Sequence, residues 1–196
     1  MAVTPLELVF ATNNRHKLNE VQALLEGKFR LVSLADMGFF EDIPEDYDTL
    51  QANALQKARH IYSLRRKNCF ADDTGLEVEA LNGKPGVYSA RYAGEQKNPK
   101  DNIKKLLENL EGVKNRNAVF RTVIALIING EEHLFEGNVT GTIVDEEQGS
   151  DGFGYDPVFL PNGYTQTFAQ MPLSLKNKIS HRGLAVTKLV NFLMAL

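Results

Sequence analysis

Hydrophobic and polar residues alternate along the chain at two spacings, one typical of strands and one typical of helices. Strands are predicted at residues 6–11, 29–34, 69–71, 76–80, 118–128 and 133–144. A first helix is predicted from the spacing of Leu18, Val21, Leu24 and Leu25, and further helices are predicted at residues 49–66 and 99–110. A terminal helix is expected to bury Ala185, Leu189, Phe192 and Leu196. Asn129-Gly130 closes a predicted hairpin, and residues 87–92 are candidates for an edge pairing. Strands that alternate with helices in this way predict an α/β fold.

Two adjacent carboxylates follow one of the predicted strands. The apolar run Cys69-Phe70-Ala71 leads into Asp72 and Asp73, and Gly75 then favours a turn. In open α/β sheets, ligands bind beyond the carboxyl ends of strands. We therefore expect an acid-metal site at the end of this strand.

Basic residues lie where the first predicted helix begins. Arg15 and Lys17 fall in its first turn, where cations are unfavourable unless an anion binds the free amides of the helix end. The alternative is an ordinary asparagine cap with exposed basic side chains. Lys57, on the second helix, is either a surface lysine or a phosphate ligand.

Two later segments carry further candidate chemistry. The loop at residues 149–157 contains three glycines around Phe153 and Tyr155, which could hold a flat ring or could simply be core residues of a tight turn. Residues 174–183 gather basic groups just before the terminal helix. His181 has no second histidine at the spacing of a zinc site, so a bound metal is expected to be a hard ion held by carboxylates, with Mg²⁺ favoured.

Composition limits the class of protein. The 196 residues, 43% of them hydrophobic, can fill one substantial core or two small lobes that share a sheet, and we expect a single domain over residues 1–196. The single cysteine, Cys69, excludes an internal disulfide and favours a reducing compartment. Residues 1–11 lack the features of a signal peptide, and no stretch approaches the length of a membrane span. A net charge of −3 argues against binding a nucleic-acid polymer. We expect a soluble, cytoplasmic protein.

Six segments together resemble one family, the HAM1-like inosine/xanthosine triphosphate pyrophosphatases. They are Thr12-Asn13-Asn14-Arg15-His16-Lys17, the Glu45 loop with residues 53–58, Ala-Asp-Asp-Thr-Gly at 71–75, residues 85–94, residues 152–157 and Ser180-His181-Arg182-Gly183. Their order follows the family over almost the whole chain. The resemblance implies hydrolysis of the non-canonical purine nucleoside triphosphates ITP, dITP and XTP to a monophosphate and pyrophosphate, with Mg²⁺. It also implies an elongated, two-lobed α/β body around a long, strongly bent mixed sheet, with a central substrate cleft, and a homodimer.

The same resemblance assigns roles residue by residue. Asp73 is expected to be the proton acceptor and a metal ligand with Glu45, and Asp72 is expected to support the metal site. The expected substrate contacts are Thr12, Asn13, Asn14, Arg15, His16, Lys17, Lys57, Thr74, Phe153, Gly154, Tyr155, Asp156, Lys176, His181 and Arg182. The chain departs from the family at Asn13, where glycine is common, and at Thr74, where serine is common. A positive φ, which glycine tolerates better, is a possible requirement at Asn13. Asp46 remains an alternative to Glu45 as the metal ligand.

The residue types fit such a reaction, and other classes of protein remain possible. Carboxylates can hold a metal, cations can neutralise phosphate, and a donor at His181 or Arg182 would favour a 6-oxo purine over adenine. How GTP would be excluded does not follow from the sequence. A nucleotide sensor would use the same groups without turnover, and a Maf-type enzyme would act on other nucleotides. A purely structural protein would leave the clustered acids and cations without a role.

Overall fold

The computed structural model describes residues 6–25 and 29–196. Part of the amino-terminal segment used above for localisation, residues 1–5, lies outside this range. Within it, no helix is long and apolar enough to cross a membrane.

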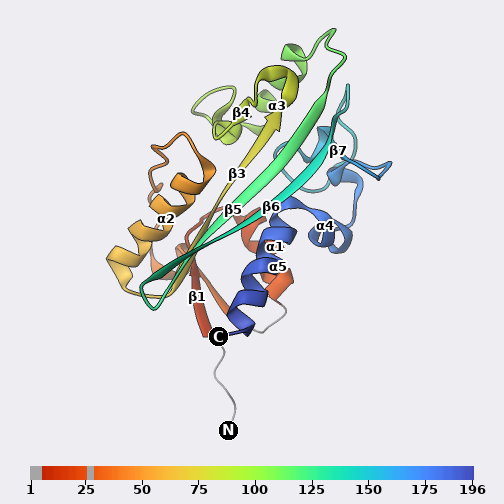
Figure 1. Ribbon diagram of the computed structural model, residues 1–196. Coiled ribbons are helices and arrows are strands. Elements are labelled where there is room, and N and C mark those ends of the chain that lie inside the picture. Colours follow the sequence, from red (N-terminus) through yellow and green to blue (C-terminus); the bar gives the residue numbers. More distant parts are fainter. Residues whose placement is uncertain (1–5, 26–28) are drawn as a thin grey trace. The chain divides into compact units, whose positions relative to one another are not determined.

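The described residues form an α/β fold around one mixed sheet. Its strands are β1 (Leu6–Phe10), β2 (Phe29–Ser33), β3 (Cys69–Val78), β4 (Pro85–Gly86), β5 (Asn117–Ile128), β6 (Glu131–Ile143) and β7 (Phe159–Pro161). The α-helices are α1 (Arg15–Leu25), α2 (Leu50–Arg65), α3 (Pro99–Asn109), α4 (Leu173–Ile179) and α5 (His181–Met194) (Figure 1). The predicted α/β class is confirmed.

The strand order makes the sheet mixed. The order is β2-β1-β3-β5-β6-β7, and β4 pairs with β3 off this path. β1 is parallel to both β2 and β3, whereas the β3–β4 and β6–β7 pairs are antiparallel. The β5–β6 hairpin turns at Asn129 and Gly130, whose φ angles are 52° and 88°. Two positive φ angles are what a type I′ turn requires, so the predicted hairpin is confirmed.

The chain packs into two compact units. Unit 1 comprises residues 1–73, 122–137 and 182–196, and unit 2 comprises residues 74–121 and 138–181. β3, β5 and β6 therefore each contribute residues to both units. Each unit has its own cluster of buried apolar side chains.

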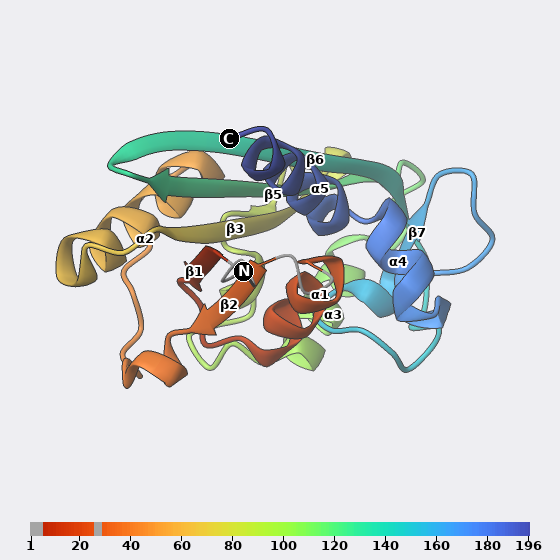
Figure 2. The ribbon, with the colours of Figure 1, turned by 90° about the horizontal axis from the view of Figure 1, so that it is seen from below.

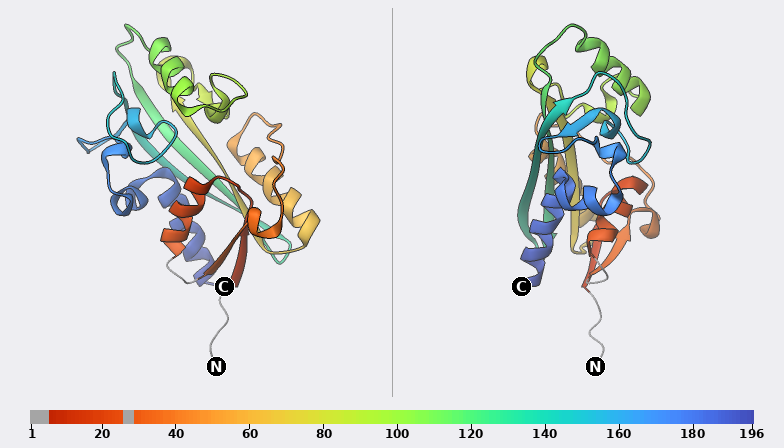
Figure 3. Two further views of the ribbon diagram at one scale, coloured as in Figure 1. Left: turned by 180° about the vertical axis from the view of Figure 1, so that it is seen from behind. Right: turned by 90° about the vertical axis from the view of Figure 1, so that its right-hand side faces the viewer.

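In unit 1, helices cover both faces of the sheet. Val21 of α1 and Leu189 of α5 pack with Phe10, Phe70 and Ile124 of the strands. α2 lies on the opposite face from α1 and α5 (Figure 3), and α5 runs alongside β5 (Figure 2). This double cover explains why β5 is buried at every position from residue 122 to residue 128.

In unit 2, the buried cluster combines helix, strand and loop. Leu106 of α3 packs with Leu76, Phe120 and Phe159 of the strands and with Phe168. The paired aromatic rings of Phe120 and Phe159 lie 4.7 Å apart, edge to face. On the other face of these strands, Glu77 and Val119 are partly buried and Thr140 is exposed.

The strand prediction around the two acids was wrong. β3 does not end at Asp72 but continues through Asp73 and Gly75 to Val78. Gly75 does not turn the chain, because it allows a close approach of β4 instead. A Cβ atom at Gly75 would lie 2.7 Å from the carbonyl oxygen of Gly86. Glycine is required at this position, but the reason is the close approach of a neighbouring strand and not a turn.

Three smaller predictions were also wrong. Residues 87–92 do not form an edge strand, since Ser89–Arg91 is a 3₁₀ turn and the edge pairing is made by β4. His181 and Arg182 lie in the first turn of α5 and not before it. Leu196 lies beyond α5 and is 75% exposed, so it does not belong to the buried stripe.

Candidate active site

Asp72 and Asp73 are brought to opposite faces of β3 by the alternation of side chains along a strand. Asp72 faces the side covered by α1 and α5, where it contacts Lys17 and Arg182. Asp73 faces α2, where it contacts Asn53 and Lys57. The two adjacent acids therefore lie in different environments, one on each face of β3.

Asp72 is a buried carboxylate held by two cations. Lys17 Nζ lies 2.8 Å from Asp72 Oδ1, and Arg182 Nε and Nη2 each lie 3.3 Å from Asp72 Oδ2. Arg182 also donates from Nη1 to Glu20 Oε2 at 2.5 Å. Burial alone would raise the pKa of Asp72, but the charges of Lys17 and Arg182 outweigh it and hold this pKa well below its usual value. Asp72 is therefore ionised and firmly paired.

Asp73 has a different balance. Its Oδ2 accepts a hydrogen bond from Asn53 Nδ2 at 3.2 Å, and its Oδ1 lies 3.5 Å from Lys57 Nζ. Burial raises the pKa of Asp73, and the nearby carboxylate of Glu45 adds to this rise, while Lys57 opposes it. The two neighbouring acids thus have pKa values shifted in opposite directions, a pattern found where two carboxyls have separate roles.

Lys57 joins the second carboxylate to this group. Its Nζ lies 2.5 Å from Glu45 Oε1, so a single ammonium group contacts both Glu45 and Asp73. Lys57 is almost fully buried, which rules out the interpretation as a surface lysine. Asp46, the alternative to Glu45, is exposed and accepts instead from Gln56 Nε2 at 2.6 Å. The structure therefore brings Glu45, and not Asp46, to Asp73.

The first loop is capped in the ordinary way. Asn14 Oδ1 accepts from the backbone N–H groups of His16 and Lys17 at 3.0 and 3.2 Å, and Thr12 Oγ1 accepts from Asn14 N at 3.1 Å. Of the two alternatives that the sequence left open, the asparagine cap is the one found at these two positions, since its side chain accepts from both amides. The side chains of Asn13, Asn14, Arg15 and His16 are exposed, and Asn13 has no positive φ. Among the basic residues of this loop, Lys17 is the one that reaches the buried acids.

Unit 2 contains a separate charged pair that joins the glycine-rich loop to α4. Lys176 Nζ lies 2.6 Å from Asp156 Oδ2, and the same oxygen accepts from Phe153 N at 2.7 Å. The ammonium group also lies 5.1 Å from the centre of the Phe153 ring, within the range of a cation–π contact. Gly152 has a φ of 74°, and a Cβ atom there would collide with Asp156 Oδ2. The loop can wrap its own carboxylate only because this residue is glycine.

The two aromatic residues of this loop differ in position. Tyr155 is buried in the core, and its hydroxyl donates to the carbonyl oxygen of Ser89 at 2.9 Å. Phe153 is half-buried beside Lys176. The core interpretation therefore holds for Tyr155, while Phe153 keeps a partly open ring. His181 stacks on Phe120 at 4.4 Å between ring centres.

The predicted site residues therefore form two groups. Unit 1 holds Thr12, Asn13, Asn14, Arg15, His16, Lys17, Glu45, Lys57, Asp72, Asp73 and Arg182. Unit 2 holds Thr74, Phe153, Gly154, Tyr155, Asp156, Lys176 and His181. Arg182 was expected to contact the base with His181, yet its guanidinium is paired with Asp72 and Glu20. Its role at the base stays a prediction.

Two residues of the unit 1 group were not among the predicted site residues. Glu20 is a buried carboxylate on α1 that pairs with Arg182, and Asn53 is a buried amide on α2 that contacts Asp73. Both carried a signal, since Glu20 lies three residues after Lys17 and Asn53 lies four residues before Lys57. Residues at these spacings share a helix face.

The donor set of unit 1 fits a magnesium ion. The described residues contain no group of three or more His, Cys, Asp or Glu side chains arranged to hold a metal ion. They do contain Glu45 and Asp73 within reach of one ammonium group. Mg²⁺ is usually held by one or two carboxylates together with substrate phosphates and water, so two carboxylates are sufficient.

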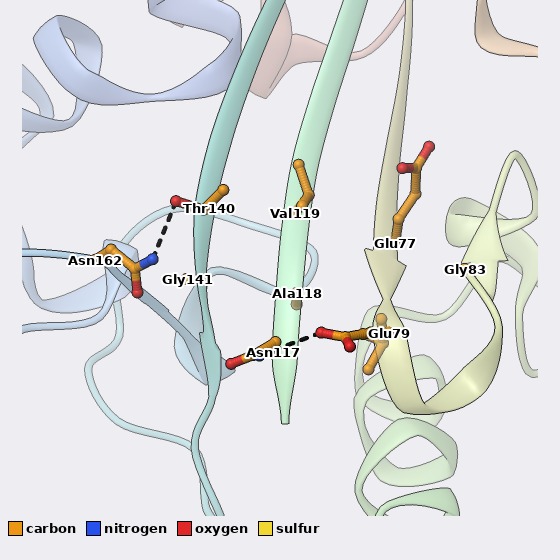
Figure 4. A pocket seen from close by; sticks show the side chains of 10 residues that line it. Glu77, Glu79, Gly83, Asn117, Ala118, Val119, Thr140, Gly141 and Asn162 are labelled. Carbon is orange, nitrogen blue, oxygen red and sulfur yellow. Dashed lines mark hydrogen bonds between the residues drawn. The ribbon is translucent and has the colours of Figure 1, made fainter. Parts of the chain in front are cut away.

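A pocket of about 470 Å³ lies elsewhere in unit 2. It lies over the face of β3, β5 and β6 that carries Glu77, Val119 and Thr140 (Figure 4). Hydrogen bonds link Asn117 to Glu79 and Asn162 to Thr140 along its lining. None of its lining residues belongs to the two predicted groups, so this pocket is distinct from the candidate active site.

Comparison with known proteins supports the resemblance. The model of the Ham1 family matches residues 8–192. A dITP/XTP pyrophosphatase of Porphyromonas gingivalis is 58% identical over 96% of this chain and 97% of the relative. One of Flavobacterium johnsoniae is 52% identical over 97% of this chain and 99% of the relative.

Solved structures agree with this match. The Ham1 protein of Staphylococcus aureus has a TM-score of 0.87 at 39% identity, covering 96% of this chain and 98% of that chain. A HAM1 protein of Coxiella burnetii has a TM-score of 0.89 at 38% identity, covering 97% of this chain and 100% of that chain. Matches of this extent and identity cannot arise from a shared motif alone, and the chain therefore belongs to the Ham1 family.

Proposed function

We propose that the protein is a nucleoside triphosphate pyrophosphatase that hydrolyses the non-canonical purine nucleotides dITP, ITP and XTP. The named relatives are dITP/XTP pyrophosphatases, and they match nearly the full length of both chains. Residues 1–196 act as one catalytic domain in this proposal. The enzyme would remove these nucleotides from the precursor pool as monophosphate and pyrophosphate.

One observation carries the proposal. Lys57 Nζ contacts both Glu45 and Asp73, which gathers two carboxylates and a cation at the α2 side of β3. A triphosphate needs both kinds of group, because carboxylates hold a divalent ion and cations neutralise the remaining phosphate charge. We assign the metal to Glu45 and Asp73 and the ion to Mg²⁺. When bound, the ion supplies positive charge to the phosphate oxygens and acidifies a water molecule.

The reaction is a hydrolysis at the α-phosphorus. The oxygen of a water molecule forms a bond to that phosphorus, the bond from the α-phosphorus to the bridging oxygen breaks, and pyrophosphate leaves. We assign the acceptance of the proton from the water to Asp73, because Asp72 is already paired with Lys17 and Arg182. The role of Asp72 is to fix these two cations.

The cations of unit 1 are suited to the leaving group. Lys17 is buried beside Asp72, and burial lowers its pKa although Asp72 opposes this shift. The pKa of Lys57 is raised, because its two carboxylate partners outweigh its burial. Both lysines can share their charge with the β- and γ-phosphates, and half-buried Thr12 and the exposed side chains of Asn13 to His16 would contribute further contacts.

Base recognition is assigned to unit 2. The half-buried ring of Phe153, with Lys176 beside it, offers a surface for a purine. Thr74, Gly154, Tyr155, Asp156 and His181 complete the proposed contacts, with Arg182 from unit 1. A donor directed to the 6-position would favour hypoxanthine and xanthine over adenine, since adenine presents an amino group there. We further propose a cytoplasmic homodimer that acts on free nucleotides, with no nucleic-acid polymer or membrane as a partner.

Pyrophosphate release tests the proposal. With Mg²⁺, the protein should turn over XTP, dITP and ITP far faster than GTP, ATP or UTP. Asp73→Asn and Glu45→Gln should each reduce turnover by about 10²- to 10⁴-fold. Asp46→Asn is the matched control, because Asp46 is directed to Gln56, and it should keep nearly full activity.

Each alternative has its own outcome. A nucleotide sensor would bind XTP without releasing pyrophosphate, and this result would refute the enzyme assignment. Preferred turnover of UTP would indicate the Maf-type activity instead. Equal rates with ATP and ITP would refute the proposed base selection while leaving the hydrolytic chemistry intact.

A further inference from the structure

Asn53 is a buried polar residue that the chemistry above does not use. It lies in α2 one turn before Lys57 and is 1% exposed. Asparagine is a poor residue for a helix interior, and an unpaired buried amide is costly. Its presence therefore requires partners, and the structure provides them on two sides.

The first partner is the backbone of the Glu45 loop, at Tyr47. Asn53 Oδ1 accepts from Tyr47 N at 2.9 Å, and Asn53 Nδ2 donates to Tyr47 O at 3.0 Å. The backbone N–H and the carbonyl oxygen of Tyr47, two residues after Glu45, are therefore both hydrogen-bonded to α2. Gln56 holds the same loop in a similar way, since it bonds both the N–H and the carboxylate of Asp46. The loop that delivers Glu45 is thus fastened to α2.

The second partner is Asp73, and the orientation of the amide determines what it does there. Tyr47 N can only donate, so the group that faces it must be Oδ1. Nδ2 then faces Asp73 Oδ2, to which it donates at 3.2 Å. The two oxygens of Asp73 consequently differ: Oδ2 is occupied by a neutral donor, and Oδ1 is directed to Lys57 and the side where Glu45 lies.

We propose that Asn53 is a positioning residue that sets both the separation of Glu45 and Asp73 and the orientation of the Asp73 carboxylate. It reaches the loop of one acid and the side chain of the other through a single amide. This inference rests on the proposed function, because it takes Glu45 and Asp73 as the metal ligands. Residues that hydrogen-bond a metal ligand commonly change metal affinity by about 10- to 100-fold when they are replaced.

The chain offers a matched control in Asn102. Asn102 is also a buried asparagine in a helix, and it fastens a loop by accepting from Ala93 N at 2.7 Å and donating to Ala90 O at 2.9 Å. Both partners are backbone groups in unit 2. Asn102→Ala therefore removes the same type of loop contact without touching a proposed metal ligand.

The experiment measures the binding of Mn²⁺, used as a probe for Mg²⁺, by electron paramagnetic resonance in the absence of nucleotide. Asn53→Ala should raise the dissociation constant for Mn²⁺ by about 10- to 100-fold. Asn102→Ala should leave it within about twofold of wild type. In turnover, Asn53→Ala should need a correspondingly higher Mg²⁺ concentration, and saturating Mg²⁺ should restore most of kcat.

The results separate the positioning role of Asn53 from the proposed enzymatic function. An Asn53→Ala protein that binds Mn²⁺ as wild type does, while wild type hydrolyses XTP, overturns the positioning role and leaves the proposed function standing. A wild-type protein that binds Mn²⁺ but hydrolyses no nucleotide overturns the proposed function, and the Asn53 comparison still holds for the metal. A wild-type protein that binds no Mn²⁺ up to millimolar concentration refutes the metal assignment and this inference with it.

Discussion

At the scale of single residues, the adjacent acids of β3 acquire different chemistry from their surroundings. Asp72 is buried against two cations, and its pKa is lowered. Asp73 is buried against a neutral amide, a lysine and a second carboxylate, and its pKa is raised. Because successive side chains of a strand point to opposite faces, no change of backbone is needed to produce this difference.

Asp72→Asn should strongly destabilise the fold. The substitution keeps the size of the side chain but removes the charge that compensates the buried cations Lys17 and Arg182. We expect a loss of about 3–5 kcal/mol in the free energy of unfolding, the range found when one partner of a buried ion pair is removed. Urea titration followed by far-UV circular dichroism measures it, and the chain contains no tryptophan that could report instead.

Asp145→Asn provides the control for this prediction. Asp145 also pairs with an arginine, Arg116, at 3.4 Å, but its side chain is 90% exposed. An exposed pair of this kind contributes only about 0–1 kcal/mol. Similar losses for both variants would show that burial of the Asp72 group does not stabilise the protein as inferred.

The contribution of Asp72 should also depend on pH. Its pKa in the folded protein lies below the value of about 3.9 expected in the unfolded chain. The stabilisation is therefore fully present above about pH 4 and is lost as the pH falls from there toward the folded pKa. The difference in unfolding free energy between wild type and Asp72→Asn should be constant from about pH 7 to about pH 5 and should shrink below about pH 4. A difference that grows in acid would contradict the lowered pKa.

At the scale of elements, β3 is one continuous strand that carries the acids in its middle. Its neighbour β1 ends at Phe10, which pairs with Phe70, so β3 runs on past the end of β1. The acids thus lie beyond the carboxyl end of β1, although they do not lie at the end of their own strand. Gly75 then allows β4 to pair closely with the second half of β3.

Gly75→Ala should weaken this pairing. The added methyl group would meet the carbonyl oxygen of Gly86, which is backbone and cannot rotate away. Crowding of this kind costs about 1–3 kcal/mol. Thermal unfolding followed by circular dichroism should show a lower midpoint, and faster amide hydrogen exchange should appear in residues 76–86. An unchanged midpoint would mean that the chain relaxes there without cost.

At the scale of the whole molecule, the two units have separate buried clusters although three strands belong to both. Loss of packing in one cluster should therefore be felt mainly within its own unit. The proposed catalytic acids belong to unit 1, whereas the proposed base-contacting residues other than Arg182 belong to unit 2. Their stabilities can be perturbed separately.

Reciprocal substitutions test this separation. Leu106→Ala in α3 and Leu189→Ala in α5 each empty a fully buried position and should cost about 2–5 kcal/mol. Hydrogen exchange measured by mass spectrometry should increase in α3 and β7 for Leu106→Ala. It should increase in α1 and β1 for Leu189→Ala. An equal increase throughout the chain for both variants would show that the two clusters open together.

From the sequence alone, several elements and the residue types of the candidate site could be predicted. Local spacing was sufficient for α2, α3 and the β5–β6 hairpin, because helix faces and turn residues depend on near neighbours. The tertiary structure alone decided which charges meet. Arg182 pairs with Asp72 and Glu20 across more than a hundred residues of chain, and Asn53 reaches Asp73 from another element. Likewise, Gly75 was predicted to form a turn, because the sequence does not reveal its contact with Gly86. That contact exists only after β4 folds back on β3. Contacts between distant segments are set by packing, and packing is not encoded in the spacing of any one segment.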